Sequence, residues 1–278
     1  ARLQTGQIVR VPPLQSKGEE GPKQLPVSDK EKAYYKSLVL YDDDDVLILN
    51  KPSGLAVQGG TGITQNLDSF LHIFENDKGV RPRLVHRLDT ETSGVLMLAR
   101  SAQSARTLGK AFKNQDVRKY YWAITSPAPV EKSGEIDAPL SKGAGGNKDK
   151  MLLDKKEGKA AKTLFETFDK ASDQFAFVCF WPRTGRTHQI RVHSALMGAP
   201  VVGDEKYGGM TDFTNFFDTD QSIHPRLYLH ARRIVCAHPE GKGKIDITAP
   251  LGRADKKLWE VLGFNADTQE DAFEEIEL

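Results

Sequence analysis

The chain has 278 residues, of which 38% are hydrophobic, and its formal net charge at pH 7 is +1. This length suits one large domain or two smaller ones. No apolar run approaches the roughly 18 residues that would indicate a transmembrane helix, and no long apolar stretch near the start indicates a secretory signal. We therefore expect a cytoplasmic globular protein with no membrane partner.

Cysteine is rare in the sequence. The two cysteines, Cys179 and Cys236, stand beside apolar residues, which is typical of reduced, buried thiols in the cytoplasm. No Cys-x-x-Cys pair and no Cys/His spacing of a metal site is present. The sequence therefore predicts no structural zinc.

The near-neutral net charge hides an asymmetry. Residues 265–278 contain six acidic residues and no Lys or Arg, so the rest of the chain has 39 basic residues against 32 acidic ones, a net charge of +7. Residues 81–119 alone hold nine basic residues and three acidic ones. A basic body with an acidic tail indicates a polyanionic partner, although a merely solvated charged surface is the alternative.

The first half of the chain suggests a linker followed by a domain. Residues 15–30 are polar and rich in Gly and Pro, as in a linker. Beyond it the pattern predicts a buried strand, a turn, an amphipathic helix, a strand–loop–strand unit with its loop at 89–94, and a second helix. These elements cover, in order, residues 46–49, 50–54, 67–74, 84–100 and 102–115.

The second half is dominated by strands. Residues 141–150 form a basic, Gly-rich loop, and a helix should follow residues 184–191, with Thr187 as its N-cap and Gly198 at its end. The expected strands are 120–125, 175–181, 227–231, 233–236 and 244–248. Because strands and helices do not alternate regularly, we predict an α+β fold with a mixed, largely antiparallel sheet flanked by helices and loops.

Asp89 is the first candidate for chemistry. It lies in a loop between two apolar segments, and Arg87, two positions before it, would share its face and could form a plain surface ion pair with it. Arg186 and Arg191 stand on either side of His188, and an arginine that reached Asp89 would keep the carboxylate ionised. Phosphate binding or a structural ion pair is the alternative for Arg191.

Tyr121 is the second candidate. In a strand, Tyr121 and Ala123 share one face, opposite Tyr120 and Trp122. An aromatic side chain beside basic residues can stack on a nucleobase, which contributes roughly 1–3 kcal/mol per base. Core packing of an amphipathic strand is the alternative.

Several strings between residues 46 and 251 together resemble the RluA family of pseudouridine synthases. The most specific are HRLDTETSG and TGRTHQIRVH. The resemblance is closest to the RluC class, which modifies large-subunit (23S) ribosomal RNA, and the start of the chain resembles the end of an S4 RNA-binding domain. The strings are NKPSG (50–54), HRLDTETSG (86–94), KYYWA (119–123), TGRTHQIRVH (184–193), VGDEKYG (202–208) and LHA (229–231).

The resemblance implies a reaction in which uridine loses its N1–C1′ bond, the uracil rotates, and C5 joins C1′. It implies that Asp89 is the essential residue, that Tyr121 packs on the base and could remove the C5 proton, and that Arg191 pairs with Asp89. Leu229 is then a wall of the base pocket, and Arg87 takes the space vacated by the flipped base.

The same motifs place four further residues at the substrate: His86, Thr92, Arg186 and His188. The implied domains are an S4-like remnant at 1–14, the linker at 15–30, a catalytic domain at 31–264 and the acidic tail at 265–278. The implied partner is RNA, most simply ribosomal RNA, bound by a monomer without cofactor or metal. The alternatives are transfer or mitochondrial RNA as substrate, or a non-catalytic RNA-binding protein of this fold.

Overall fold

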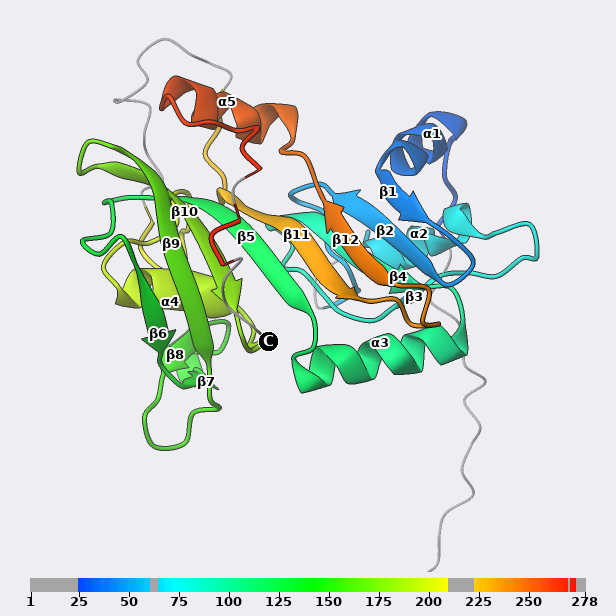
Figure 1. Cartoon of the computed structure of the whole chain (residues 1–278), viewed down its shortest axis with the longest axis horizontal. Helices are drawn as coiled ribbons and strands as arrows, with labels where there is room; N and C mark the ends of the chain where they lie inside the picture. The colour runs from blue at the N-terminus through cyan, green and yellow to red at the C-terminus, as the bar shows by residue number, and fades with distance from the viewer. Residues whose placement is uncertain (1–24, 61–64, 210–222, 270, 274–278) are drawn as a thin grey trace, which may run out of the picture.

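A mixed β-sheet forms the centre of the structure (Figure 1). The computed structural model describes residues 25–60, 65–209, 223–269 and 271–273. The strands of the main sheet lie in the order β1 (Val39–Asp42), β2 (Val46–Lys51), β4 (Ser93–Ala99), β11 (Leu229–Ala237), β5 (Arg118–Thr125), β10 (Phe175–Pro182), β9 (Lys162–Ala171) and β6 (Ser133–Asp137), with β12 (Lys244–Thr248) beside β11 and β3 (Arg83–Leu84) beside β4. Neighbours within this sheet pair antiparallel except β4 and β11, which are parallel. The predicted mixed, largely antiparallel α+β fold is confirmed.

Short helices flank the sheet, and a two-stranded hairpin stands apart from it (Figure 1). The helices are α1 (Asp29–Ser37), α2 (Leu67–Phe70), the 3-10 turn η1 (Leu71–Phe74), α3 (Ala102–Asn114), the 3-10 turn η2 (Gly145–Asn147), α4 (Gln189–Leu196) and α5 (Arg253–Val261); the hairpin is β7 (Leu140–Lys142) with β8 (Met151–Leu153). None of the described helices is both long and apolar enough to cross a membrane.

Helix α3 shows how local sequence sets these elements. The Ser101 side chain caps its first turn by accepting a hydrogen bond from the backbone N–H of Ser104. Leu108 is buried, and Phe112 packs beside it against the core. The helix ends where Gln115 adopts the left-handed conformation, with φ of 70°.

Three predicted elements differ from the structure. The helix expected at 67–74 is an α-helical turn, α2, continued as the 3-10 turn η1. The strands expected at 227–231 and 233–236 are one strand, β11, whose register shifts between Ala231 and Arg233. The loop expected at 141–150 begins inside β7, so that it is the turn of a hairpin.

The two faces of β5 have different neighbours. Tyr120 and Trp122 point into an aromatic core that includes Trp181 of β10 and Trp259 of α5. Tyr121 points to the opposite side of the sheet, as the two-residue period of a strand predicted. The aromatic core therefore lies on one face of β5. Tyr121 lies on the other face, on the same side as the polar motifs.

The described part of the predicted acidic tail packs against the body. Phe273 is buried, and its ring lies 5.9 Å from that of Tyr120 and 5.6 Å from that of Trp181. Asp271 forms an ion pair of 2.7 Å with Arg233. Residues 1–14, predicted to be the S4-like remnant, lie outside the described residues, so the division into domains stays a prediction.

Gly94 closes the parallel contact between β4 and β11. Its φ is +106°, and a Cβ at this position would lie less than 3.0 Å from the backbone N, C and O atoms of Ala231. The close approach of the two strands therefore requires glycine here.

We predict that Gly94→Ala lowers the free energy of unfolding by roughly 3 kcal/mol or more, because backbone strain and overlap with Ala231 add together. Gly109→Ala in α3 is the matched control, since nothing lies within 4 Å of the added methyl group. That substitution should raise stability by about 0.5–1 kcal/mol. Urea unfolding of both variants measures the difference, and an unchanged midpoint for Gly94→Ala would contradict the close contact.

Candidate active site

A cavity of about 570 Å³ lies where β4, β5 and β11 meet the loop before α4. Its walls come from segments that are far apart in the sequence. All nine residues that the sequence placed at the site line it: His86, Arg87, Asp89, Thr92, Tyr121, Arg186, His188, Arg191 and Leu229. Among the described residues, Asp89 is the only carboxylic acid in this lining.

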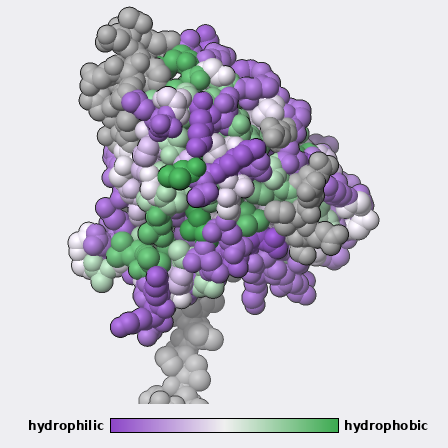
Figure 2. Space-filling view, turned by 60° about the vertical axis from the view of Figure 1, so that its left-hand side comes forward, coloured by the Kyte–Doolittle hydropathy of each residue, from purple (hydrophilic) through white to green (hydrophobic). Residues whose placement is uncertain are grey.

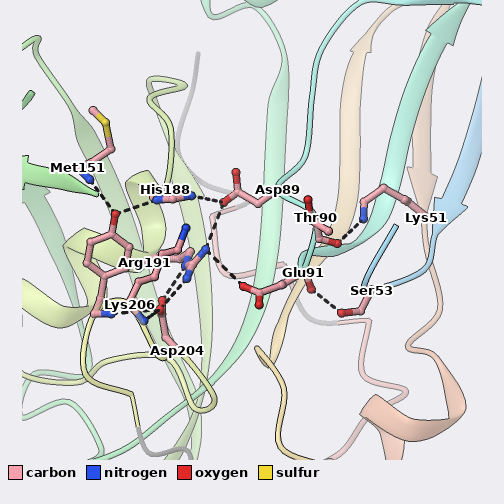
Figure 3. A network of polar contacts seen from close by, with 11 residues as sticks. Lys51, Ser53, Asp89, Thr90, Glu91, Met151, His188, Arg191, Asp204 and Lys206 are labelled. Atoms are coloured by element: carbon pink, nitrogen blue, oxygen red, sulfur yellow. Dashed lines mark hydrogen bonds and ion pairs between the residues drawn. The ribbon is translucent and has the colours of Figure 1, made fainter. Parts of the chain in front are cut away.

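The Asp89 loop is held from behind by the turn at residues 50–54. The backbone N–H of Gly54 donates to the Thr90 carbonyl at 2.9 Å, and the Ser53 hydroxyl donates to the Glu91 carbonyl at 2.7 Å (Figure 3). The Thr92 N–H donates to the carbonyl of Asp89 itself at 3.1 Å. These contacts fix the backbone on both sides of the carboxylate.

Lys51 completes this support. It is 1% exposed, and its ammonium group donates to the carbonyls of Pro52, Leu55 and Thr90 at 2.8–3.0 Å. Burial lowers the pKa of Lys51 to about 7, while the charge on Asp89 acts in the opposite direction. Sequence reasoning treated the NKPSG string as a turn and missed this buried lysine.

Arg191 pairs mainly with Asp204, which the sequence did not assign. Its Nε and Nη2 atoms each donate to an Asp204 carboxylate oxygen at 2.7 Å, and both side chains are buried (Figure 3). The remaining nitrogen, Nη1, lies 3.9 Å from Asp89 Oδ2 and 3.7 Å from Glu91 Oε2. The structure therefore places Arg191 beside Asp89, but at the outer limit of an ion pair, and its short bonds go to Asp204.

The Asp204 carboxylate is itself fixed by the backbone. Its Oδ1 atom also accepts hydrogen bonds from the N–H groups of Lys206 and Tyr207, at 3.0 and 3.2 Å. Burial acts to lower the pKa of Arg191, but Asp204 outweighs this effect, so the pKa ends above its ordinary value. Arg191 is thus a fixed positive charge.

His188 reaches Asp89 from the other side. Its Nδ1 is 2.8 Å from the Tyr207 hydroxyl, and its Nε2 is 3.9 Å from Asp89 Oδ2. Because the Tyr207 oxygen accepts from the Met151 N–H at 2.9 Å, its own proton is available to His188 Nδ1. Burial lowers the pKa of His188, and its Nε2 atom faces Asp89.

The predicted cap of α4 is wrong. The helix begins at Gln189 after His188, not after Thr187, and His188 has a left-handed φ of 52° with no side-chain cap bond. The Gln189 side chain instead holds the loop before the helix, because its Oε1 accepts from the Arg186 N–H at 3.0 Å and from the Thr184 hydroxyl at 2.6 Å. The strained backbone of His188 aims its ring into the cavity.

The aromatic and basic walls are also fixed. Burial raises the pKa of Tyr121 well above its ordinary value, and the charge on Asp89 adds to this, so the phenol keeps its proton. His86 Nε2 accepts from the Met97 N–H at 2.9 Å, and burial lowers the pKa of His86 to about 3. Burial also lowers the pKa of Lys119, a lining residue that sequence reasoning did not assign, to about 8.

The other predicted residues line the cavity in different ways. Arg87 is exposed, Thr92 and Leu229 are buried, and Arg186 donates from Nε to the carbonyl of Ala160 at 3.0 Å. Arg87 therefore faces solvent, whereas the apolar Leu229 forms a buried wall at the start of β11.

A cluster with metal-ligand chemistry lies outside the cavity lining. The ligand atoms of Asp43, Asp45 and His238 lie within 4.8 Å of one another. Asp43 Oδ2 already accepts from the Tyr41 hydroxyl at 2.7 Å and contacts His238 Nε2 at 2.9 Å, and Asp45 Oδ2 pairs with Lys242 at 2.6 Å. These contacts use the groups that a metal would need, so the cluster is a hydrogen-bonded network that joins the turn between β1 and β2 to the turn between β11 and β12.

The chain is similar to known proteins of one family. The family model described as RNA pseudouridylate synthase matches residues 45–196. A protein of Vibrio cholerae serotype O1 named ribosomal large subunit pseudouridine synthase C is 36% identical over 258 residues, which cover 90% of this chain and 77% of the relative. A protein of the same name from Buchnera aphidicola subsp. Schizaphis graminum is 38% identical, with 90% and 78% covered. The solved structure of human RNA pseudouridylate synthase domain containing 4 has a TM-score of 0.70 and 26% identity, and the match covers 84% of this chain and 96% of that one. The chain belongs to the RNA pseudouridylate synthase family, as its motifs suggested.

We predict that Asp204→Asn lowers the free energy of unfolding by roughly 3 kcal/mol or more, because it leaves the Arg191 guanidinium buried without a counterion. Glu91→Gln is the matched control: its side chain is 57% exposed and lies 3.7 Å from the same guanidinium. Removing that charge should change stability by less than about 0.5 kcal/mol. Chemical unfolding measures both variants, and equal effects would contradict Asp204 as the main partner of Arg191.

Proposed function

We propose that this protein isomerises specific uridines of large-subunit ribosomal RNA to pseudouridine, with Asp89 as the catalytic carboxylate. The observation that carries the proposal is the convergence of the motif residues on one cavity in which Asp89 is the only acid among the described lining residues. A volume of about 570 Å³ lies within the range of small-molecule sites, so a flipped nucleoside has room there.

A single carboxylate suits an isomerisation. A glycosidase normally uses two, one to protonate the leaving group and one to assist attack by water or to act as nucleophile. Here the uracil leaves C1′ and is recaptured through C5, so atoms balance within the substrate and no cofactor is required. Water must be kept out of the cavity during this step, because hydrolysis would compete with recapture.

The cavity walls have separate tasks in this reaction. Tyr121 stacks on the uracil, and Leu229 forms another wall of the base pocket. Lifting the target out of its stack costs a few kcal/mol, and Arg87 offsets part of this cost by filling the vacated space. Because Tyr121 keeps its proton in the resting enzyme, it handles the C5 proton as a relay rather than as a free base.

Arg191 and His188 act on Asp89 rather than on the base. Arg191 Nη1 and His188 Nε2 both face the same carboxylate oxygen of Asp89. Both contacts are 3.9 Å, which leaves the carboxylate oxygens available to the substrate. We propose that Arg191 and His188 position Asp89 and that they shorten these contacts when water is displaced.

Ribosomal RNA is favoured as the substrate by the names of the relatives from Vibrio cholerae and Buchnera aphidicola, both called large subunit synthases. The basic body of the chain suits any RNA. We propose a monomer in the cytoplasm; the low cysteine content and the burial of Cys179 and Cys236 fit that compartment. On the face drawn in Figure 2, hydrophilic residues break up the apolar ones into patches, as a monomer requires.

We predict that Asp89→Asn reduces pseudouridine formation by at least about 10³-fold while RNA affinity and thermal stability change little, because the side chain keeps its shape and loses only its charge. Glu91→Gln, two positions away, should retain activity. The measurement is single-turnover conversion of a large-subunit ribosomal RNA transcript, followed by pseudouridine mapping. Full turnover by a folded Asn variant would reject the mechanism.

Mapping across all RNAs from a strain that lacks the gene tests the substrate independently. Loss of pseudouridine at positions in large-subunit ribosomal RNA supports the proposal. Loss confined to transfer RNA would keep the chemistry but replace the substrate, and no loss in any RNA would favour a non-catalytic RNA-binding protein.

A further inference from the structure

Helix α3 carries a row of cations. Arg106, Lys110 and Lys113 are exposed and stand at positions i, i+4 and i+7, so they share one face of the helix over about 10 Å of its axis. We propose that this face, the α3 basic face, binds the phosphate backbone of the RNA strand that flanks the target uridine. The proposal rests on the proposed function and adds a binding surface outside the cavity.

The cations of the α3 basic face are left without local counterions. Helix α3 contains no Asp or Glu, and no described acidic residue forms an ion pair with any of the three. Two acidic residues lie in the neighbourhood: Asp116 borders the same hollow, and Glu240 accepts a hydrogen bond from Gln103. A row of unpaired cations attracts a polyanion and gives binding that depends on salt.

The α3 basic face also borders a shallow hollow in the protein surface. Arg106 and Lys110 line it together with the polar side chains of Gln103, Thr107 and Asn114. Amide and hydroxyl groups beside the cations can donate hydrogen bonds to phosphate or sugar oxygens. The chemistry of this hollow therefore suits a nucleic-acid backbone better than an apolar partner.

The helix connects this surface to the cavity. Phe112 lines the cavity and stacks on His86 at 4.5 Å, and Lys113 follows it directly. Lys119, another cavity residue, holds its ammonium 5.9 Å from the centre of the Phe112 ring. A strand whose uridine enters the cavity would thus pass Lys119 and then reach the α3 basic face; helix α3 lies beneath the sheet in Figure 1.

The test is a triple variant, Arg106→Gln, Lys110→Gln and Lys113→Gln, which removes the charges and keeps side chains that favour helix. The matched control is Lys30→Gln, Lys32→Gln and Lys36→Gln on α1, which removes three exposed charges from a helix at another corner of the molecule (Figure 1). The probe is an unmodified large-subunit ribosomal RNA transcript, with affinity measured between 50 and 200 mM salt.

We expect the α3 variant to lose at least about 10-fold in affinity at 100 mM salt, and the slope of log affinity against log salt to become shallower by about 2, near 0.7 for each single-strand phosphate contact. In steady state the loss should lie mainly in KM. The α1 variant should keep the wild-type slope. A wild-type slope for the α3 variant, or equal losses in both variants, would overturn the proposal.

The outcome separates this proposal from the proposed function. If the wild-type protein forms no pseudouridine but the α3 variant still loses its salt dependence, the proposed reaction fails and the RNA surface stands. If pseudouridine forms and the α3 variant binds like wild type, the reaction stands and the α3 basic face is rejected.

Discussion

The buried ion pair between Arg191 and Asp204 is the interaction on which the site depends. Removing both charges from water carries a desolvation penalty of several kcal/mol per ion, which only near-ideal geometry and further hydrogen bonds can offset. The two 2.7 Å bonds and the backbone N–H donors to Asp204 supply that geometry. Because two guanidinium nitrogens are engaged, Nη1 alone is left to face Asp89 and Glu91. Arg191 therefore presents a single nitrogen to the Asp89 loop.

The opposite side of Asp89 is fixed by backbone contacts rather than by charge. The ammonium group of Lys51 donates hydrogen bonds to three carbonyls, one of them that of Thr90. Gly94 allows β4 to approach β11 closely enough for the two strands to pair in parallel. Within the described structure, the contacts of the Asp89 carboxylate with Arg191 and His188 are both 3.9 Å. The surrounding contacts thus hold the Asp89 backbone in place, while its carboxylate oxygens make only long contacts. A carboxylate that acts on a substrate needs this combination of a fixed position and available oxygens.

Local patterns predicted much of the fold. The two-residue period of β5 places Tyr121 on the face opposite Tyr120 and Trp122. Helix α3 could be predicted from its own residues, because its N-cap and its amphipathic pattern are local. Residue chemistry alone suggested Asp89, Tyr121 and Arg191 as candidates, and the motif resemblance joined them and the other site residues into one site, since spacing could not show that they converge. Asp204 was missed although its string had been noticed, because its role comes from a buried partner on another element. Thr187 is wrong as a cap because the helix begins only after His188, whose left-handed backbone conformation the residue types did not indicate.

The most direct test of this account is the crystal structure of Asp89→Asn bound to a ribosomal RNA fragment that contains the target uridine. The account predicts a flipped uracil stacked on Tyr121 inside the cavity, with both Arg191–Asp204 bonds retained and Arg191 Nη1 within hydrogen-bond distance of the residue 89 side chain. A uracil outside the cavity, or an Arg191 that leaves Asp204 to bind phosphate, would contradict it.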